Sequence, residues 1–132
     1  MAEGDLDNDG RLDLLVVAQG APLAYLHNRT NGGHSVTLQL EGRASNRDAV
    51  GARVAIDSGG RRQVAWRIGG GSYLSAGDPR LLFGLGPSGK AGRVTVRWSW
   101  GESQSWEGLE ANQYWELHEG EAEPRRVGPA PR

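Results

Sequence analysis

The stretch Arg93-Val94-Thr95-Val96-Arg97-Trp98 decides the fold class, because apolar and polar residues alternate along its whole length. Successive side chains of a β-strand point to opposite faces, so Val94, Val96 and Trp98 share one face. A helix would scatter the same three side chains around its circumference. We therefore predict a strand here that buries one face and exposes the other.

The same alternation recurs on both sides of this stretch. Its apolar members, all expected to face one core, are Val36, Leu38 and Leu40; Val54 and Ile56; Val64, Trp66 and Ile68; and Trp115 and Leu117. The chain also holds 21 glycines, which favour turns between short strands. Residues 107–112 have some helical potential but are too few to form a stable helix. We predict an all-β fold in which residues 31–120 form an antiparallel β-sandwich.

Two terminal segments flank the predicted sandwich. The apolar residues 12–18 and 22–27 are separated by a Gly20-Ala21-Pro22 turn, which predicts a β-hairpin within a separate unit of residues 1–30. Exposed strand edges recruit partners, so we expect this hairpin to pack on the sandwich or to self-associate with a second copy. Residues 121–132 hold three of the six prolines and no aromatic residue, which predicts a flexible tail.

Composition and charge exclude several classes of function. The formal net charge of −1 offers no basic surface for nucleic acid. The absence of cysteine excludes a disulfide framework and a cysteine–zinc site. The longest apolar run, residues 14–18, is far shorter than the roughly 20 residues of a membrane span. The first residues also lack the basic start and the apolar stretch of a signal peptide.

The strongest chemical signal is a group of four aspartates, Asp5, Asp7, Asp9 and Asp13. A calcium ion takes six to eight oxygen ligands at about 2.3–2.6 Å, and a curled loop with carboxylates at alternate positions supplies them. We predict a Ca²⁺ site formed by these four carboxylates and the backbone carbonyl of Arg11, within a β-hairpin loop. Mg²⁺ suits such a cage less well because it retains its waters.

The aspartates admit two other interpretations. An EF-hand requires an acidic twelfth residue, and that position is Val16, within the predicted strand. The segment is therefore not an EF-hand. An acidic surface turn without an ion remains open, since Asp, Asn and Gly all favour turns.

Two parts of the chain resemble known protein families. The segment Gly4-Asp5-Leu6-Asp7-Asn8-Asp9-Gly10-Arg11-Leu12-Asp13-Leu14-Leu15-Val16 resembles a single FG-GAP/VCBS-type calcium-loop repeat. A second set of motifs lies within residues 34–118: Ser45-Asn46-Arg47-Asp48-Ala49-Val50-Gly51-Ala52-Arg53-Val54, Gly71-Ser72-Tyr73-Leu74-Ser75, Asp78-x-Arg80, Phe83-Gly84-Leu85-Gly86 and Val94-x-Val96-x-Trp98. These motifs resemble the ASPIC/UnbV domain of cartilage acidic protein-like proteins.

These resemblances imply an all-β domain, calcium in the repeat, a secreted, periplasmic or cell-surface location, and no established catalytic activity. A β-propeller requires several blades, and this chain contains one such loop, so the resemblance does not extend to a propeller fold. The charged residues of the motifs, Arg47, Asp48, Asp78 and Arg80, are expected to form an ion-pair cluster that joins two loops.

The aromatic residues divide into two groups. Trp66, Trp98 and Trp115 fall on the apolar faces and are expected in the core. Four others fit these faces less well and are candidates for an exposed platform that binds a sugar or a protein, or for caps on the sandwich edge: Tyr73, Trp100, Trp106 and Tyr114.

Catalysis is not expected, because the three histidines are far apart in sequence and no nucleophile motif is present. The residues Gly84-Leu85-Gly86-Pro87-Ser88-Gly89-Lys90 resemble a phosphate-binding loop, but a strand follows them where a helix is required. We therefore expect a non-enzymatic, calcium-binding adhesion or interaction module of a larger exported protein, with a protein or glycan partner at an extracellular surface. The alternative is a carbohydrate-binding module that uses the exposed aromatic residues.

Overall fold

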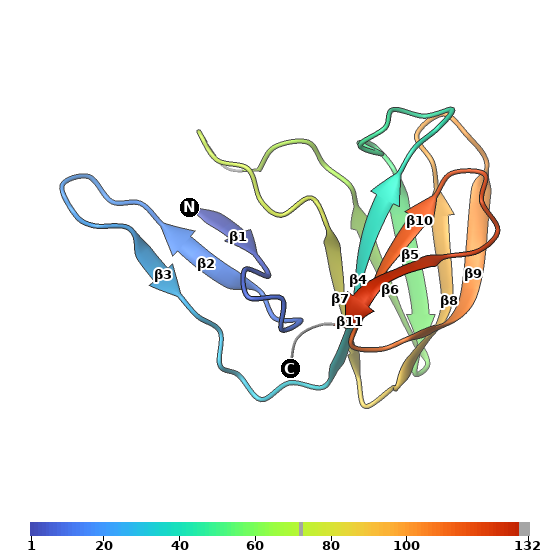
Figure 1. Ribbon diagram of the computed structural model, residues 1–132, viewed down its shortest axis with the longest axis horizontal. Helices are drawn as coiled ribbons and strands as arrows, with labels where there is room; N and C mark the ends of the chain where they lie inside the picture. Colours follow the sequence, from blue (N-terminus) through green and yellow to red (C-terminus); the bar gives the residue numbers. More distant parts are fainter. Residues whose placement is uncertain (72, 130–132) are drawn as a thin grey trace.

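The computed structural model describes residues 1–71 and 73–129, and these residues form strands and loops without a helix. The predicted all-β fold is thus confirmed (Figure 1). Within the same residues, no helix long and apolar enough to cross a membrane is found. Ser72, which belongs to one of the family-like motifs, lies outside the described residues. The strands are β1 (Ala2–Gly4), β2 (Asp13–Val16), β3 (Ala24–Leu26), β4 (His34–Glu41), β5 (Arg53–Ser58), β6 (Arg61–Trp66), β7 (Leu81–Gly86), β8 (Lys90–Arg97), β9 (Ser103–Glu110), β10 (Gln113–His118) and β11 (Arg125–Pro129).

Two four-stranded sheets form the sandwich. Their strand orders are β11-β10-β4-β7 and β6-β5-β8-β9. All neighbouring strands run antiparallel except β4 and β10, which are parallel with Leu38 opposite Trp115. The predicted inward faces of β4 and β8 are confirmed, because Val36, Leu38, Val94 and Val96 are fully buried. These aliphatic side chains meet between the sheets and form the core.

The predicted face of β6 is wrong. Val64, Trp66 and Ile68 are exposed, with 53% of Trp66 accessible to solvent, while Ala65 packs against the core. The alternation correctly predicts a strand here, but it does not identify which face is buried. β6 is an edge strand of its sheet, as β7 is of the other sheet. The side chain of Gln63 donates a 2.6 Å hydrogen bond to the Gly84 carbonyl of β7, so Gln63 and Ala65 face the other sheet while Val64 and Trp66 face solvent.

The N-terminal residues form a separate three-stranded sheet with the order β1-β2-β3. The predicted hairpin is present as β2 and β3, with Leu14 opposite Leu26, while β1 was not expected. The loop that precedes β7 holds this sheet to the sandwich. The Asp78 amide donates to the Glu3 carbonyl at 2.9 Å, and the Ser75 hydroxyl donates to the Met1 carbonyl at 2.6 Å.

The prediction of a flexible tail is wrong for part of residues 121–132. Arg125–Pro129 form β11, which pairs antiparallel with β10 at the edge of its sheet. Arg125 also forms a 2.8 Å ion pair with Glu121. Backbone pairing with β10 thus makes residues 125–129 a strand. The sequence does not predict this strand because its residues show no apolar alternation. Residues 130–132 lie outside the described residues.

Candidate metal centre

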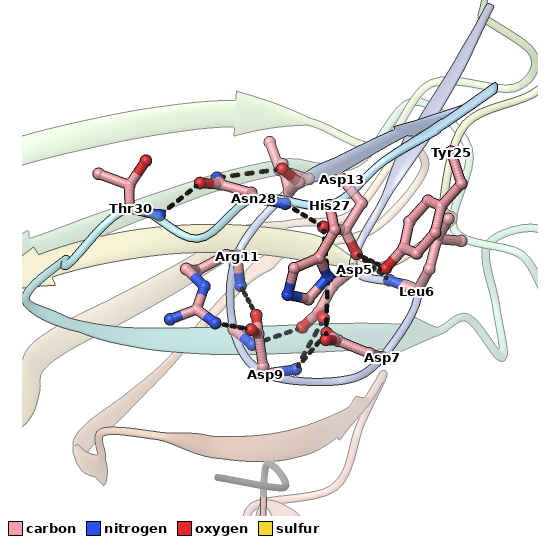
Figure 2. A network of polar contacts seen from close by, with 12 residues as sticks. Asp5, Leu6, Asp7, Asp9, Arg11, Asp13, Tyr25, His27, Asn28 and Thr30 are labelled. Carbon is pink, nitrogen blue, oxygen red and sulfur yellow. Dashed lines mark hydrogen bonds and ion pairs between the residues drawn. The ribbon is translucent and has the colours of Figure 1, made fainter. Parts of the chain in front are cut away.

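The segment of residues 5–13, called the acidic loop below, connects β1 to β2 and curls around the carboxylate of Asp5 (Figure 2). The Asp5 oxygens accept hydrogen bonds from the backbone amides of Asp9 at 2.9 Å and Gly10 at 2.8 Å. Asn8 and Gly10 have φ values of 59° and 83°, the left-handed conformation that Gly and Asn adopt most readily. The residue types of the loop therefore produce its tight curl.

The acidic side chains converge inside this curl. The Asp7 carboxylate also accepts a hydrogen bond from the Asp9 amide, at 3.2 Å, so Asp5 and Asp7 share one donor. Asp7, Asp9 and His27 each offer a ligand atom, and these atoms lie within 4.8 Å of one another. His27 Nδ1 is 3.4 Å from an oxygen of Asp7 and 3.7 Å from an oxygen of Asp13. The structure thus brings the four predicted carboxylates around one small region (Figure 2).

Asp13 lies at the start of β2 and is fully buried. Its carboxylate accepts hydrogen bonds from the amide of Asn28 at 2.8 Å, the hydroxyl of Tyr25 at 3.0 Å and the amide of Leu6 at 3.3 Å. Burial alone would raise the pKa of Asp13, but these donors outweigh it and lower the pKa below its usual value. Asp13 therefore remains a carboxylate despite its burial.

Arg11 was predicted to contribute its backbone carbonyl. Its guanidinium forms an ion pair and hydrogen bond with the Asp9 carboxylate, and its amide donates to the other Asp9 oxygen at 2.9 Å. This contact partly neutralises the negative charge of the loop. An incoming cation would therefore compete with Arg11 for Asp9.

His27 is a residue of this centre that the sequence does not predict, because it has no metal-ligand spacing to the other histidines. The signal lay in the hairpin register. Leu14 pairs with Leu26, so the next positions along the two strands bring Asp13 opposite His27. A hairpin centred on the Gly20 turn would have placed the imidazole beside the acidic loop.

The group of ligand atoms that lie close together consists of two carboxylates, Asp7 and Asp9, and the imidazole of His27. All four aspartates already accept hydrogen bonds within the loop. Asp5 and Asp13 are buried, Asp9 is half-buried beside Arg11, and Asp7 is the most exposed of the four.

The predicted aromatic platform is not assembled. Trp106 lies in the core, only 5% exposed, so its assignment to a surface platform is wrong. It lies opposite Val94 of β8, whose side chain is fully buried, so Trp106 shares the inward face of that sheet. Tyr114 is half-buried and donates to Asp5. Tyr73 and Trp100 are exposed by 88% and 85%.

The predicted ion-pair cluster is only half formed. Asp78 and Arg80 pair closely, at 2.6 Å, in the loop before β7. Arg47 instead lies 3.9 Å from Glu41 at the surface, and no contact joins it to the Asp78–Arg80 pair within the described residues. The pair contacts the acidic loop rather than another sandwich loop.

The fold defines a class of protein, an all-β sandwich of two four-stranded sheets that carries an acidic-loop sheet at its N-terminal end. The family model described as ASPIC and UnbV matches residues 42–124, which is more than half of the chain. The chain therefore belongs to the ASPIC/UnbV family. The match begins beyond the acidic loop, so it bears on the sandwich alone. No curated protein matches the chain.

Proposed function

We propose that this chain is a calcium-binding, non-catalytic interaction module of a larger exported protein. The observation that carries the proposal is the convergence of Asp7, Asp9 and His27 within 4.8 Å, beside the buried carboxylates of Asp5 and Asp13. Carboxylates held this close repel one another, and the Arg11 guanidinium offsets the charge of Asp9 alone, so a bound cation would relieve the remaining repulsion. The four carboxylates and the carbonyl of Arg11 would hold the ion, and the resemblance of the loop to FG-GAP/VCBS repeats supports calcium.

The ion would have a structural role. The N-terminal sheet consists of three short strands, and its apolar side chains Leu12, Val17, Tyr25 and Leu26 are exposed, so it has little core of its own. A bound ion stabilises the folded state by RT ln(1 + [Ca²⁺]/Kd), about 2.7 kcal/mol at a hundredfold excess over Kd. Millimolar calcium would occupy most of a site with a Kd of about 10⁻⁴ M, whereas micromolar calcium would leave it largely empty, so the proposed site suits the proposed exported location.

Thermal unfolding in EDTA and in millimolar Ca²⁺ tests the proposal. We expect a higher Tm with calcium, and we expect the difference to disappear in Asp7→Asn and Asp9→Asn. Asp57→Asn is the matched control, because Asp57 lies on β5 and pairs with Arg62 rather than with the loop. An equal Tm of the wild type in EDTA and in calcium would contradict the proposal and would show that the acidic loop is a turn without an ion.

The partner that we propose is a protein or glycan at an extracellular surface. Of the four aromatic residues offered for the alternative, a carbohydrate-binding module, Tyr73 and Trp100 remain exposed. A glycan affinity gel distinguishes the two proposals. Retardation of the wild type that is lost in Trp100→Ala would favour the carbohydrate module, and no retardation would favour a protein partner.

A further inference from the structure

The side chain of Arg80 spans the boundary between the sandwich and the acidic loop. Its Nε lies 3.0 Å from both oxygens of Asp78, and its Nη2 lies 2.6 Å from one of them. The remaining N–H groups reach the loop. Nη1 donates to the side-chain oxygen of Asn8, and Nη2 donates to the backbone carbonyl of Asp5, both at 2.8 Å. Asp78 thus orients a guanidinium whose other bonds hold the loop.

Tyr114 makes a second contact from the central strand β10 of its sheet. Its hydroxyl donates a 2.6 Å hydrogen bond to Asp5 Oδ2. The guanidinium carbon of Arg80 lies 5.1 Å from the centre of the Tyr114 ring, within the range of a cation–π interaction. Burial and the bond to Asp5 raise the pKa of Tyr114 above its usual value, so the phenol remains a donor.

The loop is also closely packed against the sandwich. A Cβ atom added at Gly10 would lie 2.5 Å from the hydroxyl oxygen of Ser35 on β4, and one added at Gly4 would lie 3.0 Å from Cβ of Asp78. Both glycines therefore permit an approach that a larger residue would prevent. The curled loop and the sandwich fit each other at several points along residues 4–10.

We propose that Arg80 and Tyr114 are positioning residues of the acidic loop, which they hold in its curled form from the sandwich. They fix Asp5 by its carboxylate and its carbonyl, and they fix Asn8 at the left-handed turn of the loop. The effect of these residues on cation affinity rests on the proposed function. If the curled form binds the cation, the affinity of the loop depends on its docking to the sandwich.

Docking and cation binding would then be thermodynamically linked. A residue that favours the curled form raises cation affinity, and a bound cation strengthens docking by the same factor. The Asp78-x-Arg80 motif, which precedes β7 of the sandwich, would thus position the acidic loop of the N-terminal sheet. The positioning contacts join residues separated by 72, 75 and 109 positions in the chain, so the isolated loop could not form them.

The test uses the full chain with two variants, Arg80→Lys and Tyr114→Phe. The first retains the charge and removes the forked geometry, and the second retains the ring and removes the donor. The matched controls are Arg93→Lys, whose exposed partner is Glu107, and Tyr73→Phe, whose ring is exposed. The readouts are hydrogen exchange at the Asp9 and Gly10 amides in EDTA and the calcium Kd measured by calorimetry.

We expect amide exchange at Asp9 and Gly10 to accelerate about tenfold in both variants, because a hydrogen bond to a charged group is lost. Calcium affinity should fall about tenfold, with no change in the two controls. Unchanged exchange in Tyr114→Phe and Arg80→Lys, or calcium binding equal to that of the wild type, would overturn the inference. If the wild type binds no calcium, the proposed function fails by itself, and exchange in EDTA still decides whether these residues position the loop.

Discussion

The carboxylate of Glu119 accepts hydrogen bonds from both the amide and the hydroxyl of Ser45, at 2.7 and 3.0 Å, across 74 positions of the chain. The amide of Arg43 donates to the same carboxylate at 2.7 Å. Glu119 follows β10 and is buried, so it joins the end of that strand to the loop between β4 and β5. A buried carboxylate thus adds to the backbone hydrogen bonds of this loop by accepting the amides of Arg43 and Ser45.

Glu119 makes the stability of the sandwich dependent on pH. Burial would raise its pKa, but the donors from Ser45 and Arg43 outweigh burial and lower the pKa below the ordinary 4.5. The unfolded chain therefore takes up the proton first as pH falls. The stabilisation is complete above about pH 4.5 and is lost as pH falls through the lower pKa of the folded state.

Replacing Glu119 with Gln tests this account. We expect a loss of about 1–3 kcal/mol at pH 7, since two amides lose a charged acceptor. We also expect a flatter stability profile in acid, measured by urea unfolding from pH 7 down to 3. Glu107→Gln, on the exposed face of β9, is the control. If the free energy of unfolding fell equally steeply with pH in Glu119→Gln and in the wild type, the role of this carboxylate would be contradicted.

Trp106 should respond differently to two substitutions. Its indole Nε1 is buried and has no hydrogen-bond partner within the described part of the chain. Trp106→Ala leaves a cavity in the core and should cost about 3–5 kcal/mol. Trp106→Phe retains most of the ring volume and removes the unsatisfied N–H, so it should cost clearly less. Equal losses of the two variants in denaturant unfolding would contradict this.

The open edge of β3 should allow self-association. β3 ends the order of its sheet, and its residues Ala24, Tyr25 and Leu26 are all exposed. No strand pairs with its outer edge among residues 1–71 and 73–129, and an uncharged edge strand is a site for pairing with a second copy. We expect molar mass in light scattering to rise with concentration, and to fall in Leu26→Lys. A mass equal to one chain at every concentration would contradict this.

Sequence reasoning located the strands in which apolar and polar residues alternate. It did not predict β9, which contains most of residues 107–112, because the buried Trp106 and Leu109 are three positions apart and give no period of two. It succeeded at Val94 and Val96, which lie on a central strand with one face covered by the other sheet. It failed at Trp66, because alternation identifies two faces but not which one meets the core. On the edge strand β6, Ala65 packs against the core, and the larger Val64 and Trp66 are exposed.

The candidate site was predictable only where its residues are close in sequence. The aspartates of the acidic loop form a local pattern, so their convergence could be expected. His27 depended on the register of the hairpin, and Tyr114 depended on how the N-terminal sheet lies against β10. Contacts across 109 positions leave no periodic trace in a single sequence.

The central claim is that the acidic loop binds calcium, and isothermal titration calorimetry tests it most directly. Ca²⁺ titrated into the full chain should give heat that saturates at about one ion per chain, with a Kd of roughly 10⁻⁴–10⁻³ M or tighter, as in extracellular modules. Asp7→Asn and Asp9→Asn should abolish this heat, and Asp57→Asn should retain it. No heat of binding by the wild type at millimolar calcium would contradict the claim.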